Sequence, residues 1–184
     1  MADWLKEKYK LKKNHNWKAP DGYRIFIADR GAVRFNIPDG WVVEPDADSI
    51  KFYDAKPPDD NCRLACSYLR LPPQVDWSGL HLSELINAAT GDDERTLTRS
   101  GEITHKQRAD LEVAWADYHF VDPVEKRQAY TRLCIARGSL IQALITLDYW
   151  PEDGAKLAKV WAEVIRSLQL GRYVEDPTIG DVLH

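Results

Sequence analysis

The eight residues Leu140–Leu147 constrain the fold of this chain more than any other segment. The run reads Leu-Ile-Gln-Ala-Leu-Ile-Thr-Leu, with apolar side chains at both odd and even positions. Successive side chains of a strand point to opposite faces, so a strand with one wet face alternates apolar and polar residues. This run therefore predicts an internal strand with both faces covered by helices. We expect the neighbours Leu144 and Ile145 to be buried on opposite sides of the sheet.

The segment after this strand predicts a long amphipathic helix. Pro151 suits a first helical turn, and Gly171 follows the expected C-terminus. Apolar residues recur at helical spacing while charged residues fall largely on the other face. The apolar positions are Leu157, Trp161, Val164, Ile165 and Leu168. This helix is expected to bury one face against the sheet.

Most of the remaining chain has the pattern of short strands joined by turns. Strands are expected at Tyr23–Ala28, Val33–Ile37, Trp41–Glu44, Ile50–Tyr53, Cys62–Leu71, Gly101–Arg108, Leu111–Val121 and Lys126–Ala136. Short links between them favour antiparallel neighbours. A second helix is predicted to start after Ser78 as N-cap and to end at Gly91. The fold class is therefore α+β, a three-layer α/β/α sandwich with a central, mainly antiparallel sheet.

Charge and turn residues divide the 184 residues into three parts: a basic arm or helix over 1–22, one domain over 23–171, and an extension over 172–184. In the first 18 residues, six lysines against Asp3 and Glu7 give +4, and since the whole chain carries −4, the remaining residues carry −8. We expect a terminal helix that docks Trp4, Leu5 and Tyr9 on the acidic body. No nucleic acid is expected as partner.

A Phe-x-Ile-Pro-x-Gly-Trp strand and turn, followed by antiparallel strands and a last helix that closes on Ser-Leu-x-Leu, resembles the PsbP-like (Mog/PsbP-like) α/β/α sandwich superfamily. The matching residues are Phe35, Ile37, Pro38, Gly40, Trp41, Ser167, Leu168 and Leu170. The resemblance covers about residues 23–171 and is carried by turn and packing positions. It implies a bacterial member of unassigned function. Because known relatives mostly bind other proteins, it favours an interaction role by analogy.

Candidate chemical groups are sparse. Asp117 and His119 lie on the same side of a predicted strand, about 7 Å apart at their backbones. They suit a proton relay or two metal ligands, but no third ligand follows at a readable spacing, which favours a hydrogen-bonded or exposed pair. Trp77, Trp115 and Trp150 lie at strand or loop margins, where an indole can line a binding surface. Core filling is the competing interpretation for all three tryptophans.

Neither metals nor cofactors are expected from the remaining motifs. Cys62 and Cys66 lie about 13 Å apart along an extended strand, beyond the reach of a disulfide or a shared metal, and with Cys134 they are interpreted as reduced core residues. The ten glycines form no phosphate-binding pattern, so no nucleotide cofactor is implied. Asp92 and Asp93 belong to an acidic run without the EF-hand pattern.

Two functional classes stay open. The leading hypothesis is a non-enzymatic protein–protein interaction module, of adaptor, chaperone-like or immunity type, that uses a sheet edge or an aromatic groove. The alternative is a small-ligand binding protein or enzyme with a pocket between sheet and helices, where Asp117, His119 and nearby aromatic residues converge. No stretch resembles a signal peptide or a membrane span, so a cytoplasmic location is expected. A homo-oligomer is compatible with the sequence.

Overall fold

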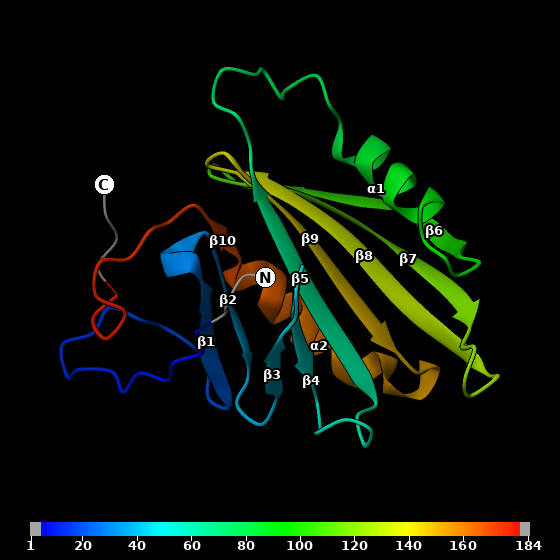
Figure 1. Cartoon of the computed structure of the whole chain (residues 1–184), viewed down its shortest axis with the longest axis horizontal. Helices are drawn as coiled ribbons and strands as arrows, with labels where there is room; N and C mark the ends of the chain where they lie inside the picture. The colour runs from blue at the N-terminus through cyan, green and yellow to red at the C-terminus, as the bar shows by residue number, and fades with distance from the viewer. Residues whose placement is uncertain (1–4, 181–184) are drawn as a thin grey trace.

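A computed structural model describes residues 5–180, which form two antiparallel sheets (Figure 1). The smaller sheet has the order β1-β2-β10 and the larger one the order β3-β4-β5-β9-β8-β7-β6. The strands of the smaller sheet are β1 (Tyr23–Ala28), β2 (Val33–Pro38) and β10 (Gln169–Leu170). Those of the larger sheet are β3 (Val42–Pro45), β4 (Ile50–Tyr53), β5 (Cys62–Arg70), β6 (Thr98–Gln107), β7 (Glu112–Val121), β8 (Gln128–Gly138) and β9 (Ile141–Tyr149).

Strand β9 is internal, as the two-sided apolar run predicts. It pairs with β5 on one side and β8 on the other, and Ile145 lies opposite both Cys66 and Cys134. Ile145 is fully buried in the main core, whereas Leu144 is half-buried and packs against a second apolar cluster. The strand begins one residue late because Leu140 sits in an exposed turn with a positive φ of 60°.

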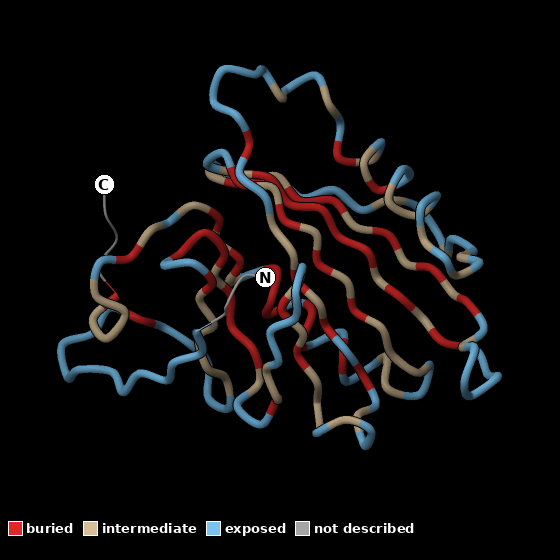
Figure 2. Tube along the Cα trace, viewed as in Figure 1, coloured by how far each residue is buried: buried red, intermediate tan, exposed pale blue. Residues whose placement is uncertain are grey.

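Helix α2 (Gly154–Ser167) covers one face of the large sheet, after a 3₁₀ turn at Pro151–Asp153. Its apolar face packs against β2, β5, β8 and β9 to form the main core, which contains Phe35, Phe52, Leu64, Cys66, Cys134, Ile145, Leu147, Leu157, Trp161, Val164 and Ile165. In Figure 2 the buried residues follow the strands as an alternating pattern, as expected for strands with a covered face. The expected helix and its buried face are confirmed.

Helix α1 (Leu82–Gly91) lies on the opposite face, over β7 and β8 (Figure 1). Leu82 and Ile86 anchor it in the second, smaller cluster. The helix begins three residues later than predicted, with His81 as N-cap in place of Ser78. The reason is local: the Asp76 carboxylate accepts the backbone N–H of Ser78 at 2.9 Å and holds it in a turn.

These features establish an α+β fold with an antiparallel sheet and one helix on each face. Helix α1 packs mainly on β7 and β8, and α1 and α2 are the only α-helices among the described residues, which therefore do not build the two complete helical layers of the predicted three-layer sandwich. The α+β class and the antiparallel sheet are confirmed, while the outer layers are thinner than expected. No helix among residues 5–180 is long and apolar enough to cross a membrane.

The N-terminal arm contains no helix between residues 5 and 22. It runs along the C-terminal tail, at the left of Figure 1, through backbone hydrogen bonds from Lys12 to Thr178 and from Asn16 to Ile179. Its side chains also differ from the expectation: Leu5 is 84% and Tyr9 54% exposed, whereas Trp17 is buried. Trp4 lies outside the described residues. Backbone pairing with the tail replaces the hydrogen bonds that a helix would supply.

Candidate functional site

Three of the five predicted site residues meet on one face of the large sheet. Trp115, Asp117 and His119 alternate along β7 and point to the side that α2 partly covers. The strand register places them beside residues of β6, β8 and β9 on that same face. We call this set the open strand face; its residues are Ser100, Trp115, Asp117, His119, Tyr130, Arg132 and Tyr149, and all of them are half-buried.

Asp117 is committed to an ion pair on this face. The Arg132 guanidinium donates to both carboxylate oxygens, at 2.5 and 2.8 Å, in the two-pronged geometry typical of strong arginine–carboxylate pairs. Arg132 also lies 5.2 Å from the centre of the Trp161 ring. Burial acts to lower the pKa of Arg132, but its bonds and attraction to Asp117 outweigh that effect and raise it. The Asp117 carboxylate is therefore occupied.

His119 has a hydroxyl partner. Its Nδ1 lies 2.9 Å from the Ser100 hydroxyl, and its ring lies 6.2 Å from that of Tyr130. A serine–histidine pair can pass a proton, but nucleophilic catalysis also needs a group that orients the imidazole. The nearby carboxylate, Asp117, binds Arg132 instead. The Ser100–His119 pair is therefore a hydrogen-bonded polar contact, and the predicted pair Asp117 and His119 have separate partners.

The remaining predicted residues lie apart from this set. Trp150 follows β9 and carries the Arg127 guanidinium 3.6 Å above its ring. Trp77 lies in the exposed loop before α1, where its Nε1 donates to the Pro72 carbonyl at 3.1 Å. It lines a shallow cavity of about 390 Å³ together with Arg137 and Leu140. The structure therefore divides the five residues among three places.

The cysteines behave as core residues. Cys62, Cys66 and Cys134 are free and buried. Burial raises the pKa of both the Cys62 and the Cys66 thiol to about 12, and it also raises that of Cys134. Within residues 5–180, no three His, Cys, Asp or Glu side chains gather in a way that could hold a metal ion.

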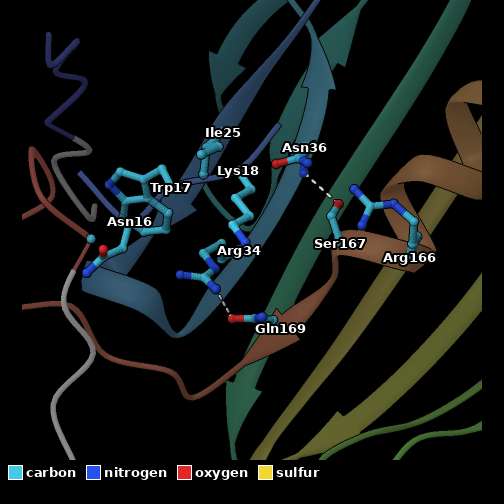
Figure 3. Close-up of a pocket in the computed structure, with 10 residues that line it drawn as sticks. Asn16, Trp17, Lys18, Ile25, Arg34, Asn36, Arg166, Ser167 and Gln169 are labelled. Carbon is cyan, nitrogen blue, oxygen red and sulfur yellow. Dashed lines mark hydrogen bonds between the residues drawn. The ribbon is translucent and has the colours of Figure 1, made fainter. Parts of the chain in front are cut away.

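A larger cavity lies where both ends of the chain meet the small sheet. It has a volume of about 620 Å³ and is shown in Figure 3. Its walls come from the arm, β1, β2, the end of α2, β10 and the tail. The lining residues are Asn16, Trp17, Lys18, Ile25, Arg34, Asn36, Arg166, Ser167, Gln169 and Gly180. We call it the Arg34 cavity, after the half-buried guanidinium in its wall.

Two kinds of contact fix the Arg34 side chain. Its guanidinium donates to the side-chain carbonyl of Gln169, and it lies 4.6 Å from the centre of the Trp17 ring (Figure 3). Burial, followed by the positive charge of Arg172, lowers the pKa of Arg34. No carboxylate among the described residues forms an ion pair with Arg34.

A polar network supports the cavity wall from behind. The buried Asn36 amide donates to Glu163 at 2.7 Å, and its backbone N–H donates to the Ser167 hydroxyl at 2.8 Å. Arg166 donates to both carboxylate oxygens of Glu163, at 2.6 and 2.7 Å. These contacts join β2 to the end of α2.

Sequence reasoning missed the Arg34 cavity. Its residues come from segments more than a hundred positions apart, and no short motif links them. One signal was available: Arg34 lies between the apolar residues Val33 and Phe35 of a predicted strand, where a charged side chain calls for a partner. The partner, Gln169, follows the last helix and could not be assigned from spacing.

The chain is similar over most of its length to a bacterial protein. It is 45% identical over 178 residues to the uncharacterised protein alr1449 of Nostoc sp. strain PCC 7120, which covers 96% of this chain and 92% of that protein. The sequence model of the Alr1449 family matches residues 24–174. The match includes Arg34 and Gln169 as well as the open strand face.

Solved structures share the fold at low sequence identity. The solution structure of the cyanobacterial PsbP protein of Synechocystis sp. PCC 6803 superposes with a TM-score of 0.59 at 10% identity, covering 83% of this chain and 94% of that one. LpqN of Mycobacterium tuberculosis, described as involved in cell envelope biogenesis, gives 0.53 at 11% identity, covering 80% and 89%. Identity this low supports the fold alone. On the family match and the 45% relative, the chain belongs to the Alr1449 family, and its fold is PsbP-like.

Proposed function

We propose that this protein is a cytoplasmic, non-enzymatic interaction module that binds an extended segment of another protein along β6 and the open strand face. The observation that carries the proposal is a long free sheet edge beside half-buried aromatic side chains. Strand β6 spans ten residues and ends the seven-stranded sheet, with β7 as its only neighbour among the described strands. An edge of this kind offers unpaired backbone groups to an incoming strand.

The opposite edge is less suited to strand addition. Strand β3 has four residues and ends at Pro45, which has no N–H to donate. The ammonium group of Lys6 in the arm also donates to the carbonyl of Val43 at 2.6 Å. Edge pairing is therefore directed to β6.

The shape of β6 makes such pairing selective. Its register with β7 shifts between Ser100 and Thr104, and Gly101 within this bulge has a φ of 85°. A bulge protects a sheet edge from unspecific association, because a straight incoming strand can form hydrogen bonds with β6 only before or only after the bulge. A partner segment that follows the bulge places alternate side chains beside Ser100 and Thr104, on the face of the sheet that carries Trp115 and Tyr130.

The packing of the core between α2 and the large sheet favours a binding module, and it disfavours an enzyme with a pocket beneath α2. The core between α2 and the large sheet consists of buried apolar side chains, and neither of the two cavities described above opens into it. This packing favours the interaction module over the alternative function. The half-buried rings of Tyr130 and Tyr149, 5.8 Å apart and nearly parallel, provide the kind of aromatic surface that interfaces favour.

Site-specific photo-crosslinking in living cells tests this proposal. A crosslinking amino acid replaces Glu102 on β6 or, as a matched control, Glu84 on α1; both are exposed glutamates. We expect one defined adduct with another protein from position 102 and none from position 84. Equal adducts at both positions would contradict the proposal, as would an adduct with a second copy of this chain.

Affinity for the protein identified in this way provides the second measurement. Tyr130→Ala should weaken binding about tenfold or more, since aromatic residues dominate interface energies. Tyr9→Ala, which removes an exposed ring from the arm, should leave it unchanged. Equal affinities for the wild-type protein and Tyr130→Ala would exclude the open strand face.

A further inference from the structure

The charges around the Arg34 cavity are unbalanced. Lys18, Arg34 and Arg166 line it, and no aspartate or glutamate among residues 5–180 does. Arg166 is neutralised from behind by Glu163. Lys18 and Arg34 take part in no ion pair within the described part of the chain. The described lining of the cavity is therefore positive, in a protein whose net charge is −4.

Most half-buried or buried arginines of the described chain have a carboxylate partner, whereas Arg34, like Arg24 beside the Trp41 carbonyl, has none. Arg95 pairs with Asp93 and Asp148, Arg132 with Asp117, and the buried Arg137 with Glu112. A buried cation without a counterion is costly, and folded proteins usually pair it. The amide of Gln169 stands where a carboxylate would balance Arg34. The structure thus holds this guanidinium in place and leaves its charge available.

We infer that the Arg34 cavity binds the oxyanion group, carboxylate or phosphoryl, of a small organic molecule. A guanidinium presents parallel N–H donors that match either group. With one donor used by Gln169, others remain, and Lys18 adds an ammonium group from the arm. The depressed pKa of Arg34, caused first by burial and then by Arg172, is consistent with a site that gains from an incoming negative charge.

The cavity also suits the organic part of such a molecule. Trp17 and Ile25 supply an aromatic and an aliphatic wall. A volume of about 620 Å³ falls within the roughly 300 to 1,000 Å³ of small-molecule sites, well above what a bare inorganic ion needs. Asn36 and Ser167 are already engaged with each other and with Glu163, so they shape the wall. This inference does not depend on the partner surface at β6.

Calorimetric titration with three matched probes tests the inference. Benzoate carries a carboxylate, phenyl phosphate carries a phosphoryl group, and benzamide has nearly the shape of benzoate without its charge. We expect at least one anion to bind at about millimolar concentration or below, and benzamide to bind at least tenfold more weakly. The tighter of the two anions identifies the oxyanion. Binding of neither anion, or equal binding of benzamide, would overturn the inference.

The Gln169→Glu variant provides the decisive control. It keeps the contact with Arg34 and supplies an internal carboxylate, so anion binding should fall at least tenfold while the fold and the position of Trp17 persist. Arg34→Gln should have the same effect on binding. Arg172→Gln removes a nearby positive charge outside the cavity lining and should change the affinity by no more than about threefold.

These variants also distinguish a loss of charge at the site from a loss of binding that is caused by a displaced arm. If Arg34→Gln releases the arm, Gln169→Glu still reports on the charge, because it retains a hydrogen-bond acceptor for Arg34. Undiminished anion binding by folded Gln169→Glu would overturn the inference. So would an equal loss in Arg172→Gln, since that result would show a general electrostatic attraction without a defined site.

Discussion

The interior beneath α2 and the Arg34 cavity differ in every physical respect that bears on function. The interior is apolar, closed and built from strands with strong alternation, and even its three cysteines are buried. The cavity is polar and open, and its walls come from the arm, the small sheet, the end of α2 and the tail. One region specifies the fold, and the other retains groups that the fold does not neutralise.

This difference indicates where ligand chemistry can arise in the molecule. In the interior, each polar group would need a partner before it could be buried, so the sequence supplies few of them. In the cavity, Arg34 is stabilised by Gln169 and Trp17 without losing its charge. Four predictions test the contrast, beginning with the largest expected effect.

The rate of thiol labelling should show the largest difference between the folded and the unfolded protein. Burial raises the pKa of Cys66 to about 12, so at pH 8 the reactive thiolate is scarce even before access is considered. We expect labelling of the native protein to be slower than that of the denatured chain by about a thousandfold or more. Rapid modification of Cys66 or Cys134 in the native state would show that the interior is open.

Truncation of Ile145 should strongly destabilise the fold. Its side chain is fully buried beneath α2, so Ile145→Ala should lower the free energy of unfolding by about 2 to 5 kcal/mol. Leu144→Ala, next to it on the other face, should cost less, about 1 to 2 kcal/mol, because that side chain is only half-buried. Urea unfolding provides the measurement. Equal losses would mean that the two faces are equally well covered.

Gly180→Ala should loosen the cavity while sparing the interior. A Cβ at position 180 would lie 2.6 Å from the Trp17 ring, and the φ of 87° adds strain. We expect a cost of about 1 to 2 kcal/mol and faster proteolysis of the arm. Gly22→Ala is the matched control, since Gly22 also has a positive φ but no atom within 4 Å of its added Cβ. If the arm were cleaved at the same rate in both variants, backbone strain would explain the effect and the contact with Trp17 would not.

Acid should release the arm from the tail, and of the four predicted effects this one should change the stability of the fold least. Hydrogen bonds from Lys12 and Thr178 lower the pKa of Asp176 to about 2, below its ordinary value of 3.8. A depressed pKa stabilises the folded state above the ordinary value, and this contribution is lost as the pH falls from about 4 through 2. The indole N–H resonance of Trp17 should follow this loss. Asp176→Asn should remove the pH dependence, and Asp48→Asn should retain it.

The fold could be predicted from the sequence to the extent that it depends on local pattern. Alternation in Cys62–Arg70 and the helical spacing from Leu157 to Leu168 each reflect one element packing on one core, so single-segment reasoning identified them. It placed the start of α1 too early, because a turn held by Asp76 competes with capping by Ser78. The arm was mistaken for a helix because its hydrogen-bond partners lie in the tail, more than 160 residues away.

The candidate sites were harder to predict, for the same physical reason. Asp117 and His119 were found because neighbours along a strand share a face at every second residue. Their partners Arg132 and Ser100 lie on the neighbouring strands β8 and β6. The pairing register between these strands, which the sequence pattern does not specify, brings them together. Arg34 and its hydrogen-bond partner Gln169 are 135 residues apart in the sequence. Trp17 contacts Arg34 because the arm folds back over the small sheet. No periodicity in the sequence encodes such meetings.

The Arg34 cavity is expected to bind small anions while the interior beneath α2 stays closed. The most direct measurement is a ¹H–¹⁵N NMR titration of the isotope-labelled protein with benzoate and then with phenyl phosphate. We expect saturable shifts of the Trp17 indole and of the Arg34 and Gln169 amides, with the amides of Cys134 and Ile145 unmoved. Shifts centred on Cys134 and Ile145, or no shift around Arg34 with either anion, would contradict it.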